Sequence, residues 1–276
     1  MRVACLQMNS GPDVNANLKF IAEQTAIAAD QGVRLLQLPE NYAQMPARAS
    51  EQVKEVANQG RIQDFLKQLA STHDIALVAG ALPINDPDKL DQNPYARCLA
   101  IETDGSVKAQ YDKLHLFNVD LPDGSHYRES DRFSEAEEAQ NNLVVVDLSG
   151  VRLGLSICYD LRFPEQYRAL VDRGAELISV PSAFTYDTGK VHWKTLLQAR
   201  AVENLCFVFA AAQTGAHASG RQTWGHSMII GPWGDILAQA DESPGLIMAD
   251  IDLKSLQQLR QRFPALTHRR LGLNQH

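Results

Sequence analysis

Short apolar runs alternate along this chain with segments in which apolar residues recur at helical spacing. Ile62, Phe65, Leu66 and Leu69 follow the i, i+3, i+4, i+7 pattern of an amphipathic helix. On the same criteria, helices are predicted at residues 17–30, around 62–69, and at 164–173, 190–204 and 252–262. Strands are predicted at residues 3–8, 35–38, 75–81, 96–102, 107–111, 143–148, 151–157, 177–180, 206–212, 228–230 and 246–250.

Two pairs of neighbouring strands are joined by turn residues, Thr103-Asp-Gly105 and Ser149-Gly150, and are predicted to form hairpins. Strand–helix alternation mixed with hairpins predicts a single α/β domain with two sheets covered by helices. Two polar loops are expected, at 118–142 and 214–223, and long loops in compact domains are often functional. The glycines of the second loop are spaced as in a phosphate loop, but no Lys-Ser/Thr follows Gly220, so nucleotide binding is not expected there.

The composition is that of an ordinary globular protein and does not indicate a nucleic-acid or membrane partner. The 276 residues are 45% hydrophobic and 21% charged, with a net charge of −7. This acidic balance argues against nucleic acid as a partner. No apolar run reaches the roughly 18–20 residues of a membrane span, and the first residues do not form a signal peptide. We therefore expect a cytoplasmic protein that does not bind membranes.

The four cysteines are widely spaced, which favours free thiols in a reducing compartment. Cys5, Cys98 and Cys206 lie in apolar runs and are expected to be buried and inert. Cys158 differs because an apolar run ends just before it and a polar segment follows. A strand that delivers a thiol to a turn exposes it to a ligand, so Cys158 is a candidate nucleophile.

Like Cys158, two charged residues follow predicted strands. Glu40 follows the apolar run 35–38, and Lys113 follows the run 107–111. A glutamate, a lysine and a cysteine are the parts needed for thiol-based hydrolysis of an amide. Taken singly, Glu40 could be an acid at a helix N-terminus and Lys113 a surface charge.

Other interpretations stay open at this stage. Cys158 could pair with His115 or His192 in a cysteine–histidine hydrolase, although Glu40 would then have no role. The chain could also be a catalytically silent scaffold. No histidine pair has the HExxH spacing of a metal site, so neither a metal nor another cofactor is expected.

Three segments, in the expected order, resemble the nitrilase (carbon–nitrogen hydrolase) superfamily. They are Leu38-Pro-Glu40, Tyr111-Asp-Lys113 and Cys158-Tyr-Asp-Leu-Arg-Phe-Pro-Glu165. The likeness extends from Met1 to about Arg270, which implies a domain over residues 1–270 and a tail at 271–276. It is greatest for the Nit branch, as Thr188-Gly189, Pro244-Gly-Leu246 and 266–270 indicate. The resemblance implies a four-layer α-β-β-α sandwich that forms a homodimer. It also implies a second glutamate between the lysine and the cysteine, for which Glu129 matches best.

The resemblance assigns roles to these residues. Glu40 would be the general base, Cys158 the nucleophile that forms a thioester, Lys113 the cation that stabilises the oxyanion, and Glu129 the residue that orients Lys113. The backbone N–H of Tyr159 would be a second oxyanion donor. Substrate-binding residues are expected at Tyr159, Arg162, Phe184 and Thr185, although Arg162 could instead tie the turn after Cys158 to Glu165.

The resemblance also implies a substrate class, namely small α-keto ω-amides that are hydrolysed to a carboxylate and ammonia. Deaminated glutathione is the expected substrate, because the long loop 118–142 could cover a molecule larger than a five-carbon acid. Arg128, Arg162 and Lys190 are the candidates for binding its carboxylate. The alternative is an omega-amidase that acts on α-ketoglutaramate or succinamate.

Overall fold

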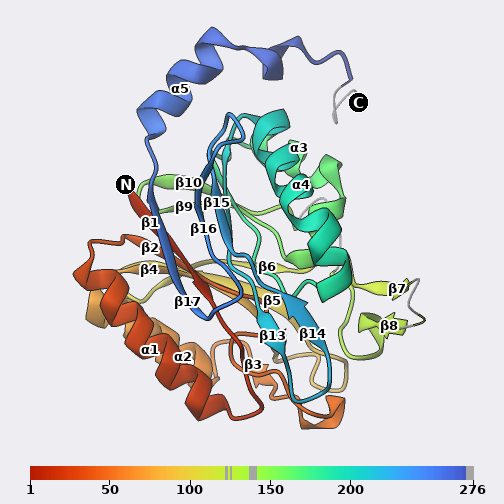
Figure 1. Cartoon of the computed structure of the whole chain (residues 1–276). Coiled ribbons are helices and arrows are strands. Elements are labelled where there is room, and N and C mark those ends of the chain that lie inside the picture. The colour runs from red at the N-terminus through yellow and green to blue at the C-terminus, as the bar shows by residue number, and fades with distance from the viewer. Residues whose placement is uncertain (122–123, 125, 137–141, 272–276) are drawn as a thin grey trace.

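The computed structural model describes residues 1–121, 124, 126–136 and 142–271. Two sheets lie face to face at its centre (Figure 1). The first has the order β17-β1-β2-β4-β5-β6, and β3 also pairs with β4. These strands are β1 (Arg2–Gln7), β2 (Leu35–Leu38), β3 (Glu55–Val56), β4 (Ala76–Asn85), β5 (Tyr95–Ile101), β6 (Val107–Asp112) and β17 (Gly245–Asp250).

The second sheet has the order β16-β15-β12-β11-β10-β9. Its members are β9 (Val145–Leu148), β10 (Val151–Leu155), β11 (Leu177–Ser179), β12 (Phe207–Ala210), β15 (Met228–Ile230) and β16 (Ile236–Gln239). In both sheets the central strands are parallel and the outer strands antiparallel. The two predicted hairpins, β5–β6 and β9–β10, are confirmed.

Helices cover the outer face of each sheet and complete the α-β-β-α layers that the family resemblance implies (Figure 1). Helices α1 (Val14–Asp30) and α2 (Arg61–His73) pack on the first sheet, and α3 (Pro164–Asp172) and α4 (Tyr186–Asn204) pack on the second. Leu36 of β2 lies in the core beneath α1 and α2, whereas Leu35 lies in the core between the sheets. Because both faces are buried, β2 is apolar except for Gln37, whose side-chain oxygen accepts the backbone N–H of Ala211.

The second polar loop was predicted wrongly. Most of residues 214–224 form a hairpin of two short strands, β13 (Thr214–Ala216) and β14 (Gln222–Trp224). These strands pair only with each other and carry few apolar residues, so no alternating pattern marks them. The strands β3 and β16 were missed because they are short and only half-buried.

The first polar loop also contains structure. A two-stranded ribbon of β7 (Asn118–Asp120) and β8 (His126–Arg128) leads into a 3₁₀ turn at Glu129–Asp131. Residues 122–123, 125 and 137–141 of that loop, and residues 272–276 of the expected tail, lie outside the described residues.

The last helix, α5 (Leu253–Arg262), lies beyond one end of the sheets (Figure 1). Asp252 caps it by accepting the backbone N–H groups of Lys254 and Ser255. Among the helices that the structure describes, none combines the length and the apolar character that a bilayer span requires.

Candidate active site

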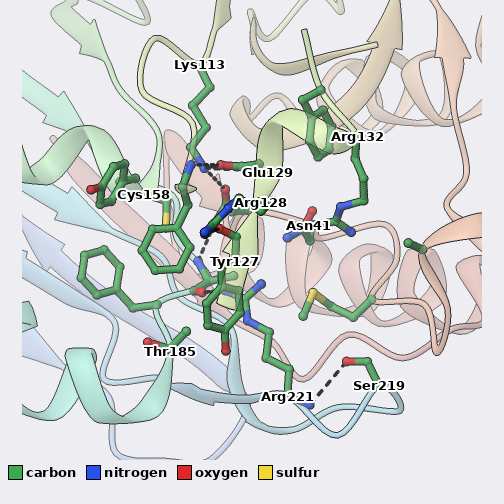
Figure 2. Close-up of a pocket in the computed structure, with 18 of the residues that line it drawn as sticks. Asn41, Lys113, Tyr127, Arg128, Glu129, Arg132, Cys158, Thr185, Ser219 and Arg221 are labelled. Atoms are coloured by element: carbon green, nitrogen blue, oxygen red, sulfur yellow. Dashed lines mark hydrogen bonds and ion pairs between the residues drawn. The ribbon is translucent and has the colours of Figure 1, made fainter. Parts of the chain in front are cut away.

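The three candidate catalytic residues meet at one end of the two sheets. Glu40 follows β2, Lys113 follows β6, and Cys158 begins a 3₁₀ turn, Cys158–Arg162, just after β10. All three line one cavity of about 330 Å³, and Figure 2 shows Lys113, Glu129 and Cys158 around it. The carboxyl ends of parallel strands are where α/β sheets bind ligands, so the location fits the topology.

Both carboxylate oxygens of Glu40 are fixed. Oε1 accepts a hydrogen bond from Lys113 Nζ at 2.8 Å, and Oε2 accepts one from the backbone N–H of Ala183 at 2.9 Å. The Gln213 amide holds the Glu40 carbonyl at 3.0 Å. The side chain is buried. Two segments from different parts of the chain therefore fix the direction of this carboxylate, and a third holds the backbone of Glu40.

Lys113 joins Glu40 to a second glutamate. Its Nζ lies 2.9 Å from Glu129 Oε1 and 2.8 Å from Glu129 Oε2, and the Lys113 side chain is 2% exposed. The backbone N–H of Phe117 also donates to Glu129 Oε2, at 2.6 Å. The structure thus brings Glu129 to the place that the resemblance implies, from the 3₁₀ turn that follows β8.

The electrostatics of the site follow from one cation between two carboxylates. Burial alone would raise the pKa of Glu40, but the charge and hydrogen bond of Lys113 outweigh burial and hold it below its usual value. Burial opposes the charge on Lys113 as well, yet Glu129 and Glu40 raise its pKa above the usual value. The resting site therefore contains an ionised base beside a permanent cation.

Burial and the adjacent Glu40 carboxylate raise the pKa of the Cys158 thiol well above its usual value, against the opposing effect of Lys113. Because the pKa of Glu40 is low and that of Cys158 is high, the proton resides on sulfur in the resting enzyme.

The backbone around Cys158 is specialised. Its φ is +48°, in the left-handed region that non-glycine residues rarely adopt, and its N–H donates to the Pro181 carbonyl at 3.0 Å. Such strain, worth about 1–3 kcal/mol, concentrates at functional sites. Tyr159 lies in the first turn of the 3₁₀ segment, where N–H groups have no acceptor within the helix. None of the described residues accepts its N–H, so it is available as the second oxyanion donor.

A buried aspartate ties the lysine segment to the cysteine turn. Asp160 Oδ2 accepts hydrogen bonds from Tyr111 Oη at 2.6 Å and from the Ile157 N–H at 2.8 Å. Its Oδ1 accepts the His115 N–H at 3.1 Å and lies 2.7 Å from His115 Nδ1. Asp160 therefore fixes the spacing between the segments that carry Lys113 and Cys158.

The predicted substrate-binding residues Tyr159, Arg162, Phe184 and Thr185 all line the cavity. Arg162 does not pair with Glu165. Its Nη atoms lie 3.4 Å from His192 Nδ1, and its guanidinium lies 5.5 Å from the centre of the Phe184 ring.

Of the three expected carboxylate-binding cations, Arg128 and Arg162 line the cavity, whereas Lys190 is exposed on α4 and does not. Two arginines that the sequence analysis missed, Arg132 and Arg221, line it as well. Arg221 lies in the hairpin that was predicted as a polar loop. The local sequence around Arg221 does not indicate that it lines a cavity, because this depends on where the hairpin packs in the folded protein.

The cysteine–histidine alternative finds no support in the geometry. His115 pairs with Asp160 and stacks on Phe163 with ring centres 3.6 Å apart, and His192 contacts Arg162. Neither histidine lines the cavity. Within the described part of the chain, no three His, Cys, Asp or Glu side chains are grouped as metal ligands would be.

Comparisons with known proteins place the chain in a family. The model of the carbon-nitrogen hydrolase family matches residues 2–261. A deaminated glutathione amidase of a Synechocystis strain is 43% identical over 266 residues, which are 96% of this chain and 97% of that protein. The human deaminated glutathione amidase is 38% identical over 275 residues, with 98% and 83% covered.

Solved structures of related proteins support the same family assignment. The NitFhit protein of Caenorhabditis elegans matches with a TM-score of 0.89 and 39% identity over 98% of this chain and 65% of that longer one. Nit3 of Saccharomyces cerevisiae, a member of branch 10 of the nitrilase superfamily, matches with a TM-score of 0.85 and 29% identity, covering 98% and 97%. This chain belongs to the carbon–nitrogen hydrolase family of the nitrilase superfamily and is a hydrolase of carbon–nitrogen bonds other than peptide bonds.

Proposed function

We propose that the protein is an amidase that hydrolyses deaminated glutathione through a thioester on Cys158. The observation that carries the chemistry is the buried cluster in which Lys113 Nζ lies within 2.9 Å of both Glu40 and Glu129 beside the Cys158 thiol. The substrate rests on relatives of that name, which are 38–43% identical over at least 96% of this chain.

Acylation begins when the amide carbonyl enters the cavity. Glu40 accepts the proton of the Cys158 thiol as Sγ bonds to the carbonyl carbon, and the C=O electron pair moves to oxygen. Lys113 and the Tyr159 N–H stabilise this oxyanion. The carbon–nitrogen bond then breaks, the leaving nitrogen takes the proton from Glu40, and a thioester remains.

Deacylation repeats these roles with water. Glu40 accepts a proton from a water molecule as the water oxygen bonds to the thioester carbon. Lys113 again faces the oxyanion. When the intermediate collapses, the carbon–sulfur bond breaks, the sulfur regains its proton from Glu40, and a carboxylic acid leaves.

The leaving group depends on the substrate. The scissile amide of deaminated glutathione joins the α-ketoglutaryl group to the cysteine nitrogen. Its products are α-ketoglutarate and cysteinylglycine, so the ammonia expected from the sequence applies only to primary amides such as α-ketoglutaramate. Because the nitrogen then carries a dipeptide, the cavity must extend beyond Glu40. The ribbon residues Tyr127 and Arg128 and the hairpin residue Arg221 line the same cavity as Glu40 and are available to contact the dipeptide.

A comparison of kcat/KM for deaminated glutathione, α-ketoglutaramate and a simple nitrile tests the proposal. We expect deaminated glutathione to be preferred, because contacts to the parts of the substrate remote from the amide help to position the reacting carbon. Equal values for the first two substrates would leave only a general ω-amidase. A preference for the nitrile would contradict the proposal altogether.

We also propose that the protein is a cytoplasmic homodimer. Four buried, unpaired cysteines fit a reducing compartment. Exposed apolar side chains gather on and near α4 and α5, where Val191 is 66% exposed, Val202 47%, Trp233 62% and Phe263 49%. The rings of Trp233 and Phe263 pack edge to face at 5.4 Å. A second copy of the chain would cover such a surface.

A further inference from the structure

The cations that line the cavity differ in how their charge is balanced. Lys113 is held between two glutamates. Arg128 lies 2.7 Å from Asp120 Oδ1 and also donates to the backbone carbonyls of Val119 and Tyr127. These two cations are already satisfied by the protein itself.

Arg221 has no such partner. No aspartate or glutamate forms an ion pair with it within the part of the chain that the structure describes, and its Nε is buried without a hydrogen bond to any described residue. A partly buried guanidinium with an unused donor is unfavourable unless an anion satisfies it. An Arg fork matches the two oxygens of a carboxylate better than any other side chain does.

The protein holds this guanidinium in place. One Nη atom donates to the Ala183 carbonyl, and the Cζ atom lies 5.6 Å from the centre of the Tyr127 ring. The N–H of the same Ala183 donates to Glu40 Oε2, so a single residue links Arg221 to the proposed base. The charge of Arg221 also helps to keep the pKa of Glu40 low. Figure 2 shows Arg221 and Ser219 on the hairpin side of the cavity, across from Lys113.

The two other arginines of the cavity are less suited to this task. Arg162 lies against His192 and over the Tyr159 and Phe184 rings, and Arg132 is exposed. We propose that Arg221 is the specificity residue of this site and binds a carboxylate of an anionic amide substrate. This inference rests on the proposed function, because it needs a substrate with a carboxylate remote from the scissile amide.

The test compares deaminated glutathione with its dimethyl ester, in which the amide is unchanged and both carboxylates are masked. Arg221→Gln should lower kcat/KM for the acid by about tenfold or more, the scale of a lost charge-assisted hydrogen bond. It should lower kcat/KM for the diester by less than about threefold, since the diester offers no carboxylate to lose. Arg221→Lys should fall between wild type and Arg221→Gln, because it keeps the charge and loses the fork.

Arg128→Gln is the matched control, because it removes the same charge from the same cavity at a position that Asp120 already neutralises. Arg128→Gln should lower kcat/KM for the free acid clearly less than Arg221→Gln does. Equal losses at both arginines would assign the effect to the general charge of the cavity and overturn the proposal. So would equal losses of Arg221→Gln on acid and diester, because Arg221 would then act through Glu40.

The outcome can be separated from that of the proposed function. If the wild type hydrolysed α-ketoglutaramate in place of deaminated glutathione, the substrate proposal would fail. The same comparison of acid and ester, made with α-ketoglutaramate, would still decide the role of Arg221. Thermal unfolding of each variant checks that the hairpin remains folded.

Discussion

At the scale of single residues, the site depends on one positive charge shared by two carboxylates. Lys113 keeps Glu40 ionised, and burial together with the Glu40 charge keeps the Cys158 thiol protonated by raising its pKa. Each member therefore sets the protonation state of the next, and replacing one changes the others.

Cys158→Ala should abolish hydrolysis and leave the fold intact, because a single sulfur that lines a cavity contributes little packing. Cys206→Ala is the matched control. This thiol is fully buried, burial raises its pKa to about 12, and its loss should lower the free energy of unfolding by about 1 kcal/mol without affecting turnover. Product release and urea unfolding of both variants measure the two effects. Retained turnover in Cys158→Ala would exclude it as the nucleophile.

Lys113→Ala should lower kcat by about 10²-fold or more, the scale of losing one oxyanion donor. Lys113→Arg should not restore activity, because a planar guanidinium cannot place its charge where Nζ lies between Glu40 and Glu129. Steady-state kinetics with saturating substrate measure kcat for both variants. Near wild-type turnover in Lys113→Ala would remove Lys113 from the mechanism, whereas activity in Lys113→Arg would show that the exact position of the charge is not critical.

The pKa of Glu40 has a consequence for stability. Because this pKa lies below the ordinary glutamate value in the folded protein, the unfolded chain takes up a proton at Glu40 first as the pH falls. The stability that Glu40 contributes is present above about pH 4.3 and is lost as the pH falls through the folded value. Glu40→Gln should therefore show a shallower decline in unfolding free energy as the pH falls below about 4.3. An unchanged slope in urea titrations would contradict this.

At the scale of elements, the site depends on close contact between β4 and the segment after β2. Gly80 lies in β4 where the pairing with β5 shifts register, and a Cβ there would lie 2.0 Å from the Pro39 carbonyl oxygen and 2.8 Å from Glu40 N. Both contacts are with backbone, which cannot move aside as a flexible side chain can. The glycine thus sets how closely the Glu40 segment approaches the sheet.

Gly80→Ala should displace Glu40, lowering kcat/KM by at least about tenfold and the unfolding free energy by about 1–3 kcal/mol. Gly11→Ala is the control, because a Cβ at Gly11 meets nothing within 4 Å. Kinetics and urea unfolding of both variants provide the comparison. If Gly80→Ala behaved like Gly11→Ala, the contact with Pro39 would not be what positions the base.

At the scale of the whole molecule, the proposed homodimer can be tested through the surface on α4 and α5. Light scattering of the wild type should give twice the mass of one chain. Trp233→Ala and Val202→Asp should shift the protein toward the monomer, because both change an apolar patch that a partner would cover. Leu90→Ala is the control, since Leu90 is 62% exposed elsewhere. A monomeric wild type would contradict the dimer.

The sequence by itself determined most of the elements, because hydrophobic spacing reports the burial of a local segment. The predicted helices and strands match the structure to within a few residues, and Glu40, Lys113 and Cys158 were identified at the ends of such segments. Glu129 was found only through family resemblance, since its half-exposed polar loop has no period. The same lack of a period hid the β13–β14 hairpin.

Only the tertiary structure decided which side chains share the cavity. Glu40 accepts hydrogen bonds from Lys113, which is 73 residues away in the sequence, and from the Ala183 N–H, which is 143 residues away. Lys190, which the sequence placed near the site, lies on the exposed face of α4, whereas Arg221 enters the cavity from a hairpin with no apolar pattern. Local periodicity reports which face of a segment is buried. It does not encode where distant segments converge, and an unpaired arginine becomes a binding residue only through that convergence.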